Sequence, residues 1–234
     1  MACNAGPDII EDGLVLCLDA ANINSYPKSG TTWSDLAGSN NGTLTNGPTF
    51  DAGNGGSIVF DGTNDYVDVS GTASLNAPIS TDITISTWIY ITKNNAWQGV
   101  ITKNRSTFTQ VGLFLSSNNE FVFGFSGTGG NLLGSSFSTN IWYNVVVVQK
   151  ANTSRKIYLN GSLDVTQTSS FGTTSSGSET FRLGQATGTN EYFGGRISNA
   201  IIYYNKALTA DEIRQNYEAT VGRFTKWLHH TNPQ

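Results

Sequence analysis

The sequence predicts an all-β protein, a two-sheet antiparallel jelly-roll sandwich with one short C-terminal helix. Short apolar runs alternate with clusters of Gly, Asn, Ser and Thr along most of the 234 residues, a pattern typical of strands joined by tight turns. Only the segment 208–222 has the apolar period of an amphipathic helix. Two stacked sheets also explain why the strands are half polar, because each strand buries one face against the other sheet.

The clearest strand is "ITISTWIYITK" (83–93), in which side chains alternate between two faces. Ile83, Ile85, Ile89 and Ile91 point to one face together with Thr87, whereas the residues between them point to the other. One of these two faces is expected to pack against the other sheet. The other expected strands cover 13–20, 56–62, 65–71, 98–103, 110–116, 120–126, 142–150, 180–185 and 195–208.

A hairpin is predicted at "KIYLNGSLDV" (156–165), where apolar and polar residues alternate on both sides of Asn160-Gly161. A type I′ turn needs two consecutive residues with positive φ, and Asn-Gly is the pair that most readily provides them. The β-branched run "WYNVVVVQK" (142–150) before it favours a central strand.

The predicted helix carries start and stop signals at its ends. Thr209 as N-cap and Glu212 three residues later form a capping box, and Leu208 with Ile213 forms a hydrophobic staple. Gly222 is placed to end the helix. An apolar stripe on one side of this helix would dock on a sheet.

The chain divides into an arm (1–12), the sandwich (13–223) and a tail (224–234). No composition shift marks a second domain, and sandwiches of this length are often single units. The arm and the tail are too short to be domains, but they are long enough to hook a neighbouring subunit. A homo-oligomer is therefore compatible with the sequence.

Composition excludes several classes of partner. The net charge of −4 and the absence of a Lys/Arg-rich run argue against nucleic acid. No apolar run approaches the roughly 20 residues of a membrane span, and the first residues lack the pattern of a secretory signal. Charged residues make up 13% of the chain, about half of the usual share of about 25%, so we expect a surface of uncharged polar residues.

Two cysteines, Cys3 and Cys17, leave two alternatives. They could form a disulfide, or Cys17 could be a small buried residue while Cys3 lies in the arm. Two cysteines in a chain this long do not make a disulfide framework, and we favour the second alternative. The chain is then expected to fold in a reducing cytoplasm.

The C-terminal half resembles concanavalin A-like sandwiches, and within them laminin-G-like and pentraxin-like domains. The stretches "IYLNG", "FRLGQ" and "FGGRISNAIIYYNKALTADEIRQNY" carry the resemblance. The N-terminal half, with "GLVLCLDAANINSYPKSGTTWSDLAG" and "GSIVFDGTNDYVDV", resembles the version found in virion proteins of tailed bacteriophages. The resemblance covers about residues 13–224. Its signature positions are Gly195, Ile197, Asn199, Leu208, Glu212, Ile213 and Tyr217.

This superfamily includes glucanases, but no catalytic residues are predicted. Glycoside hydrolysis needs two carboxylates on either side of the bond, and sandwich glucanases carry them on one strand as E-x-D-x-x-E. No such pattern occurs, and Asp164 stands alone near the hairpin. We therefore expect a protein that is not an enzyme.

A calcium site of the pentraxin type is not implied either, because the acids of that site are missing. Ala186 to Gly188 and Phe108 to Gln110 stand in their places. Another candidate metal cluster remains at Asp61, Asn64 and Asp65, whose oxygens would suit Ca²⁺. The alternative, which we favour, is that Asp61 and Asn64 cap a tight turn. Asp19 and Asp35 lie elsewhere in the same half, and no other cofactor is expected.

Carbohydrate binding requires exposed aromatic faces beside polar groups. Trp97, Trp33 and Tyr192 fall in predicted loops and are the candidate glycan-binding residues. Trp97 lies at a hairpin tip, whereas Trp33 could equally plug one end of the sandwich. Trp88 and Trp142 fall inside strands, where core positions are expected.

Together these features predict a non-enzymatic structural protein of a tailed-phage virion, made in the host cytoplasm. Capsid decoration is the first expectation, with the major capsid protein or other virion proteins as partners and with glycan binding as an added property. The alternative is a tail-associated, lectin-like module that binds host-surface glycans. A glycoside hydrolase is the least favoured alternative.

Overall fold

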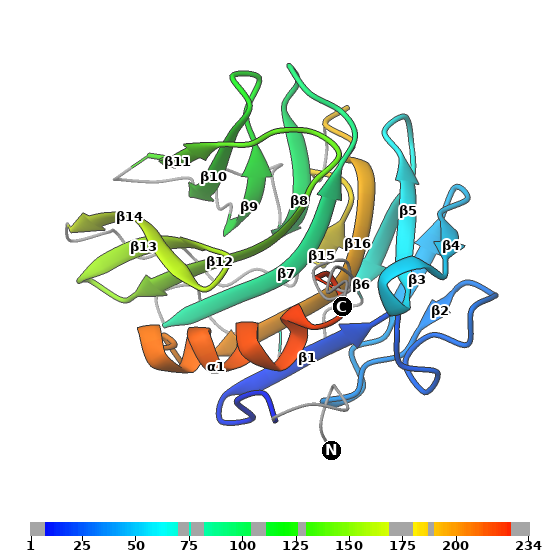
Figure 1. Cartoon of the computed structure of the whole chain (residues 1–234), viewed down its shortest axis with the longest axis horizontal. Coiled ribbons are helices and arrows are strands. Elements are labelled where there is room, and N and C mark those ends of the chain that lie inside the picture. The colour runs from blue at the N-terminus through cyan, green and yellow to red at the C-terminus, as the bar shows by residue number, and fades with distance from the viewer. Residues whose placement is uncertain are drawn as a thin grey trace, which may run out of the picture.

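The computed structural model describes residues 8–69, 75, 82–103, 111–125, 130–168, 180–186 and 190–225. Within these ranges the chain forms two antiparallel sheets of eight strands each and one α-helix, which confirms the predicted sandwich (Figure 1). Sheet A has the order β14 (Ser162–Thr168), β13 (Ser154–Leu159), β12 (Trp142–Lys150), β7 (Ile83–Ile91), β16 (Gly194–Tyr204), β5 (Ser57–Asp61) and β4 (Thr49–Asp51), with β1 (Leu14–Asp19) also paired to β16. Sheet B has the order β11 (Leu132–Ser136), β10 (Glu120–Phe125), β9 (Val111–Leu115), β8 (Gln98–Lys103), β15 (Phe181–Leu183), β6 (Tyr66–Val69), β3 (Gly42–Thr45) and β2 (Thr32–Trp33).

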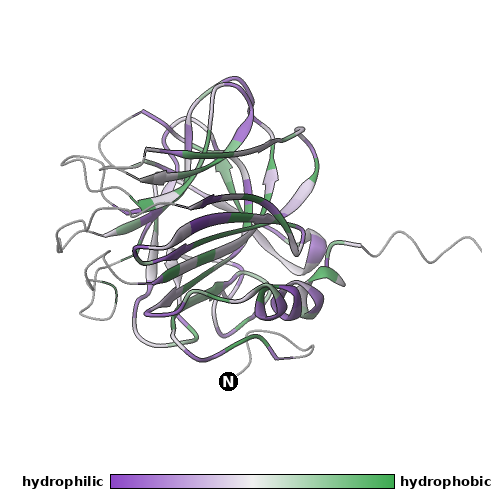
Figure 2. Ribbon diagram, turned by 90° about the vertical axis from the view of Figure 1, so that its left-hand side faces the viewer, coloured by the Kyte–Doolittle hydropathy of each residue, from purple (hydrophilic) through white to green (hydrophobic). Residues whose placement is uncertain are grey.

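The core lies between the two sheets, and strand β7 shows how the alternating pattern builds it. The predicted alternation is present, and Ile83, Ile85, Ile89 and Ile91 are all buried in the main apolar cluster. Each fully buried isoleucine stabilises the fold by about 1.5–3 kcal/mol. Figure 2 shows the apolar colour concentrated in the strands and the polar colour over helix α1 and many loops.

The outer face of sheet A is also covered, by helix α1 (Ala210–Val221). Trp88 on β7 stacks against Tyr217 of the helix and against Phe224, with ring centroids 5.7 Å and 4.0 Å apart. Its indole N–H donates to Thr220 Oγ1 over 2.8 Å. Trp88 is therefore buried outside the inter-sheet core, while Trp142 is only half-buried beside Phe224.

The helix begins as the sequence predicts. Thr209 is the N-cap, and the reciprocal hydrogen bonds of a capping box with Glu212 are present. Leu208 and Ile213 are both buried in one apolar cluster, which confirms the staple. The helix also ends where the sequence predicts, because Gly222 follows the last helical residue. Its φ of −57° is right-handed, and the chain continues into a further turn.

The Asn-Gly hairpin is confirmed, and it forms one edge of the sandwich. Asn160 and Gly161 have φ values of 50° and 78°, as a type I′ turn requires. Asp164 on β14 contacts the other sheet, because its Oδ2 accepts the backbone N–H of Ser135 on β11 over 2.7 Å. This bond joins the edge strands of the two sheets.

Short strands in the first fifty residues, and β11, were not predicted. β2, β3 and β4 have two to four residues each, too few to show a period in the sequence. Thr and Gly dominate β3, so its strand conformation depends on pairing with β6.

The ends of the sandwich extend beyond the expected boundaries. Ile9, from the expected arm, is buried in the cluster under helix α1, and the N–H of Ile10 donates to Asn216 Oδ1 over 2.9 Å. Phe224, from the expected tail, stacks on Trp88. Both residues belong to the folded body because they fill the space around the helix.

Cys17 is buried and disulfide-bonded. The expectation of a free, buried thiol at this position is therefore wrong. Cys3, the other cysteine of the chain, lies outside the described residues. In addition, no helix within the described ranges is long and apolar enough to span a membrane.

Candidate functional site

Three connecting segments meet at one end of the sandwich, which we call the loop end. The Lys93 ammonium donates to the carbonyl oxygens of Gly62 and Tyr192 over 2.9 and 3.3 Å. Gln98 donates to the Lys93 carbonyl oxygen over 2.9 Å and accepts from the N–H of Gly194 over 3.0 Å. These bonds join segments that are far apart in sequence into one unit. The loop end comprises residues 62–65, 92–97, 184–186 and 190–193.

Trp97 is the exposed aromatic residue at the loop end, with 37% of its surface accessible. The segment of Tyr192 lies beside it, because the N–H of Gly99 donates to the Glu191 carbonyl oxygen over 3.0 Å. Tyr192 is half-buried and pairs with Gln185 in a β-bridge. The structure thus brings these two candidate residues to one end, and their part in glycan binding stays a prediction.

Trp33 is elsewhere and has no access to solvent. It lies on β2, and its ring packs edge-on against Tyr26 at 6.5 Å between centroids. A fully buried indole cannot stack on a sugar, so Trp33 as a glycan-binding residue is wrong. The alternative is confirmed, because Trp33 is part of the packed interior.

Asp61, Asn64 and Asp65 form a capped turn at the loop end. Asp61 Oδ1 accepts the backbone N–H groups of Thr63 and Asn64 over 2.7 and 3.2 Å. Asp65 is buried, and its Oδ2 accepts the N–H of Asp61 over 3.0 Å. These bonds are those of the turn-capping alternative, and they occupy oxygens that a cation would need.

The two carboxylates of this turn differ in environment. Burial raises the pKa of Asp61, but hydrogen bonds from the backbone of Thr63, Asn64 and Asp65 outweigh it, and the pKa is lowered from 3.8. Burial, followed by the nearby charge of Asp61, raises the pKa of Asp65. Among the described residues no group of three or more His, Cys, Asp or Glu side chains could hold a metal ion.

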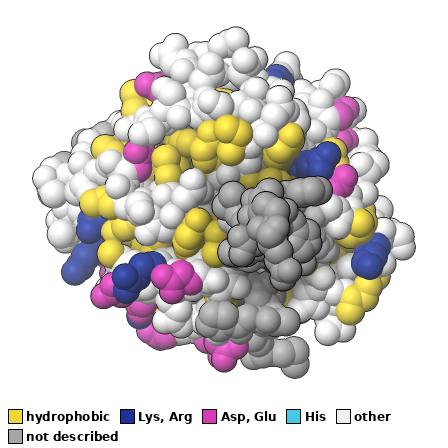
Figure 3. All heavy atoms as spheres, viewed as in Figure 1, with side chains coloured by type: hydrophobic (Ala, Val, Ile, Leu, Met, Phe, Trp, Pro, Cys, Tyr) yellow, Lys and Arg dark blue, Asp and Glu magenta, His cyan; other side chains and the backbone are white. Residues whose placement is uncertain are grey.

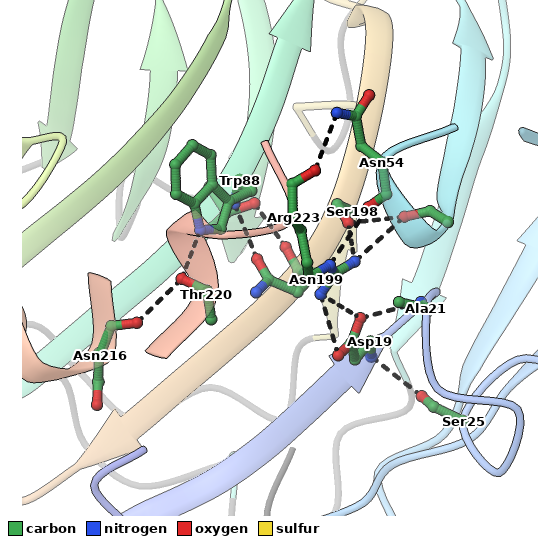
Figure 4. A network of polar contacts seen from close by, with 12 residues as sticks. Asp19, Ala21, Ser25, Asn54, Trp88, Ser198, Asn199, Asn216, Thr220 and Arg223 are labelled. Atoms are coloured by element: carbon green, nitrogen blue, oxygen red, sulfur yellow. Dashed lines mark hydrogen bonds and ion pairs between the residues drawn. The ribbon is translucent and has the colours of Figure 1, made fainter. Parts of the chain in front are cut away.

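Asp19, another acid of the N-terminal half, has a structural partner. It is buried at the end of β1 and pairs with Arg223, whose Nη1 lies 3.0 Å from Asp19 Oδ1 (Figure 4). Arg223 Nη2 also donates to Ser198 Oγ over 2.5 Å, and its Nε donates to the Asn54 carbonyl oxygen over 3.3 Å. Arg223 thereby holds the chain after helix α1 against sheet A.

Asp35 is likewise structural. Its Oδ1 accepts the N–H groups of Cys17 and Ala37, each over 2.9 Å, and its Oδ2 accepts the N–H of Asn40 over 3.0 Å. These bonds fix the loop between β2 and β3 against β1, and they leave Asp35 no evident role in ligand binding.

The sequence did not single out a polar group on the outer face of sheet B. Tyr66 and Asp68 alternate with the buried Val67 and Val69, so they point outward. Arg182 on β15 pairs in register with Asp68. The alternation in "YVDV" predicts the shared face of Tyr66 and Asp68, but no local signal predicts a partner 114 residues away.

A family model described as the concanavalin A-like lectin/glucanase superfamily matches residues 61–214. This chain belongs to that superfamily. It is a lectin-like domain, and its matched region includes the loop end and most of both sheets. A search of curated proteins gave no match.

Solved structures with the same fold include enzymes and binding domains. The binding domain of botulinum neurotoxin DC, in complex with rat synaptotagmin II, has a TM-score of 0.70 at 17% identity over 90% of this chain. The binding domain of Paraclostridial mosquitocidal protein 1 has 0.68 at 18% over 88%, and a sialidase of Trypanosoma rangeli with 2,3-difluorosialic acid has 0.69 at 17% over 91%. This chain corresponds to 52% of each toxin domain and 34% of the sialidase. At such identities the likeness is one of fold.

Proposed function

We propose that this chain is a non-enzymatic structural protein of a tailed-phage virion that decorates the capsid and binds glycans through its loop end. The observation that carries the glycan-binding part is the exposed Trp97 at the hydrogen-bonded loop end. Aromatic faces pack on the apolar faces of sugars, while neighbouring polar groups fix their orientation. The toxin binding domains with the same fold support a binding role.

The arrangement of carboxylates supports the absence of catalysis. The strands of sheet B carry two, Asp68 on β6 and Glu120 on β10. Three strands lie between β6 and β10, so about four spacings of about 4.8 Å separate them by about 19 Å. Paired carboxylates that hydrolyse glycosides lie about 5–10 Å apart. In addition, Asp68 is held by Arg182, with 2.7 Å between Oδ1 and Nε.

The virion role is supported by the resemblance of the N-terminal half to phage virion proteins and by the surface composition. Figure 3 shows a face on which charged side chains occur only in small groups, among hydrophobic patches and a larger area of backbone and other side chains. A tail-associated module that binds host glycans is the second candidate, favoured by the same exposed Trp97.

Substitution of Trp97 tests glycan binding. We expect Trp97→Ala to weaken retention on a host-surface polysaccharide on the order of tenfold, because an aromatic contact contributes about 0.5–1.5 kcal/mol beyond its buried area. Leu163→Ala is the control, since Leu163 is 54% exposed on the edge strand β14. Binding by the wild type that is unaffected by Trp97→Ala would remove the loop end as the site.

Electron microscopy of purified virions tests the structural role. Density for this sandwich on the capsid surface would support decoration, and density on the tail would favour the second candidate. If mass spectrometry of purified virions does not detect the chain, both virion roles are excluded, although glycan binding by the isolated protein would still stand.

A further inference from the structure

We infer that the outer face of sheet B carries a sugar-binding site, formed by Tyr66, Asp68 and Arg182, that takes a neutral glycan through two adjacent hydroxyl groups. This inference rests on the proposed glycan-binding function and specifies a second contact area and the class of ligand. The three residues come from neighbouring strands, β6 and β15, whose register places Arg182 opposite Asp68.

Arg182 is held rigidly on this face by three contacts. Its Nε donates to Asp68 Oδ1 over 2.7 Å, and its Nη1 donates to Gln185 Oε1 over 2.6 Å. The guanidinium carbon lies 4.4 Å from the centre of the Tyr66 ring. A planar guanidinium fixed in this way loses little further entropy when it binds a ligand.

The same two charged groups keep atoms available for a ligand. Within the described part of the chain, Asp68 Oδ2 and Arg182 Nη2 have no hydrogen-bond partner, and the side chains are 34% and 22% exposed. An acceptor beside a donor is complementary to two neighbouring sugar hydroxyls, one donating to Asp68 and the other accepting from Arg182. Both bonds would be charge-assisted and therefore stronger than neutral ones.

The charge balance of the face favours a neutral sugar. The charges of Asp68 and Arg182 cancel, and the free oxygen of Asp68 would repel a carboxylate or sulfate on the ligand. Lys103, the other basic residue in the strands of sheet B, is buried, and its ammonium donates to the Leu75 carbonyl oxygen. The described strands of sheet B therefore offer no spare positive charge on this face for an acidic polysaccharide.

The proposed site is continuous with the loop end. Gln185, which accepts from Arg182, pairs with Tyr192 in a β-bridge. Thr102 on the neighbouring strand β8 donates to the Gln185 carbonyl oxygen over 2.8 Å. A chain of several sugars bound at Arg182 could thus extend toward Trp97.

Affinity electrophoresis of the full chain tests the site. The gels contain a neutral mannan, galactan or β-glucan, or the acidic polygalacturonate. We expect retention by at least one neutral polymer and none by polygalacturonate. Asp68→Ala and Arg182→Lys should each weaken that retention at least tenfold, because lysine lacks the planar fork and the ring contact.

Arg196→Lys is a matched control. Arg196 pairs with Asp51 over 3.1 Å and lies 5.3 Å from the Tyr90 ring centre, but on sheet A. Its replacement should leave retention unchanged within twofold. Thermal melting of each variant checks folding.

Amide chemical shifts of the wild type supply a measurement that needs no variant. The bound neutral polymer should perturb residues 66, 68 and 182 more than residues 51 and 196. Three results would each overturn the site. They are shift changes confined to the loop end, a preference for polygalacturonate, and unchanged binding by Asp68→Ala and Arg182→Lys. If Trp97→Ala still weakens binding in those cases, glycan binding through the loop end survives. If no polymer retains the wild type, the site and the glycan-binding part of the proposed function are both overturned, and the virion role is tested separately.

Discussion

At the scale of single residues, the pair of Asp19 and Arg223 shows what a buried charge does in this fold. Asp19 is 2% exposed, and the Arg223 side chain is 16% exposed. Burial raises the pKa of Asp19 above 3.8, although Arg223 and the N–H of Ala21 act in the opposite direction. The pair therefore joins the end of helix α1 to β1, although removing the two charged groups from water costs free energy.

Removing Arg223 should destabilise the protein markedly. We expect Arg223→Ala to lower the free energy of unfolding by about 3 kcal/mol, because it leaves a buried carboxylate without its cation. Arg214→Ala is the control, since the Arg214 side chain is 64% exposed. This substitution should lower the free energy of unfolding by less than about 1 kcal/mol. Chemical denaturation measures both, and equal effects would contradict the assigned role of Arg223.

The contribution of Asp19 to the stability of the fold changes with pH in one direction. Because the pKa of Asp19 is higher in the folded than in the unfolded state, the folded protein binds the proton more tightly. Its contribution to stability is thus largest in acid and decreases as pH rises from 3.8 through the folded pKa. Arg223→Ala should raise that pKa further and enlarge the decrease. A smaller decrease in the variant than in the wild type would disprove this assignment.

At the scale of elements, the boundaries of helix α1 depend on a few local contacts. Thr209 Oγ1 accepts the N–H of Glu212 over 3.3 Å, and Glu212 Oε2 accepts the N–H of Thr209 over 2.8 Å. The helix in turn covers Trp88 on sheet A through Tyr217. Loss of the cap should therefore loosen the cover over the outer face of this sheet.

The N-cap can be tested by two substitutions at one position. We expect Thr209→Ala to lower the free energy of unfolding by about 1 kcal/mol, whereas Thr209→Ser keeps the accepting oxygen and most of the stability. Denaturation curves followed by tryptophan fluorescence would report the change, because Trp88 lies under the helix. If alanine and serine behave alike, the side-chain cap does not contribute.

At the scale of the whole molecule, the two sheets have separate outer faces, and the proposed binding residues lie on only one of them. Helix α1 covers the outer face of sheet A (Figure 1). The residues proposed to bind sugar lie on the outer face of sheet B. Distances across a sheet of eight strands keep Asp68 and Glu120 apart. A single carboxylate held by an arginine is suited to binding hydroxyl groups, not to breaking a glycosidic bond.

Incubation with the polymer that the wild type retains tests this prediction for the whole chain. We expect reducing ends to appear no faster than in buffer alone, at any pH between 4 and 9. If the wild type releases reducing ends and Asp68→Ala or Glu120→Gln does not, the substituted carboxylate is catalytic. The protein would then be a hydrolase and not only a binding protein.

Local pattern was enough to predict the sandwich, the Asn160-Gly161 hairpin, the alternating faces of β7 and the start of helix α1. Each of these depends on residues within about ten positions of one another, through side-chain periodicity, turn conformation or capping. The exposure of Trp97 was also predicted. The hairpin tip expected there is wrong, because β7 belongs to sheet A and β8 to sheet B, so the segment with Trp97 crosses between the sheets.

Only the tertiary structure decided the environment of residues whose partners are remote in sequence. Trp33 is buried in the main apolar cluster, Asp164 contacts Ser135 on the other sheet, and Arg182 contacts Asp68 on the neighbouring strand. Periodicity predicts the face on which a side chain lies, but strand order and register determine its neighbours on that face. Pairs such as β7 with β16 or β15 with β6 join segments far apart in the chain, so no local pattern predicts them.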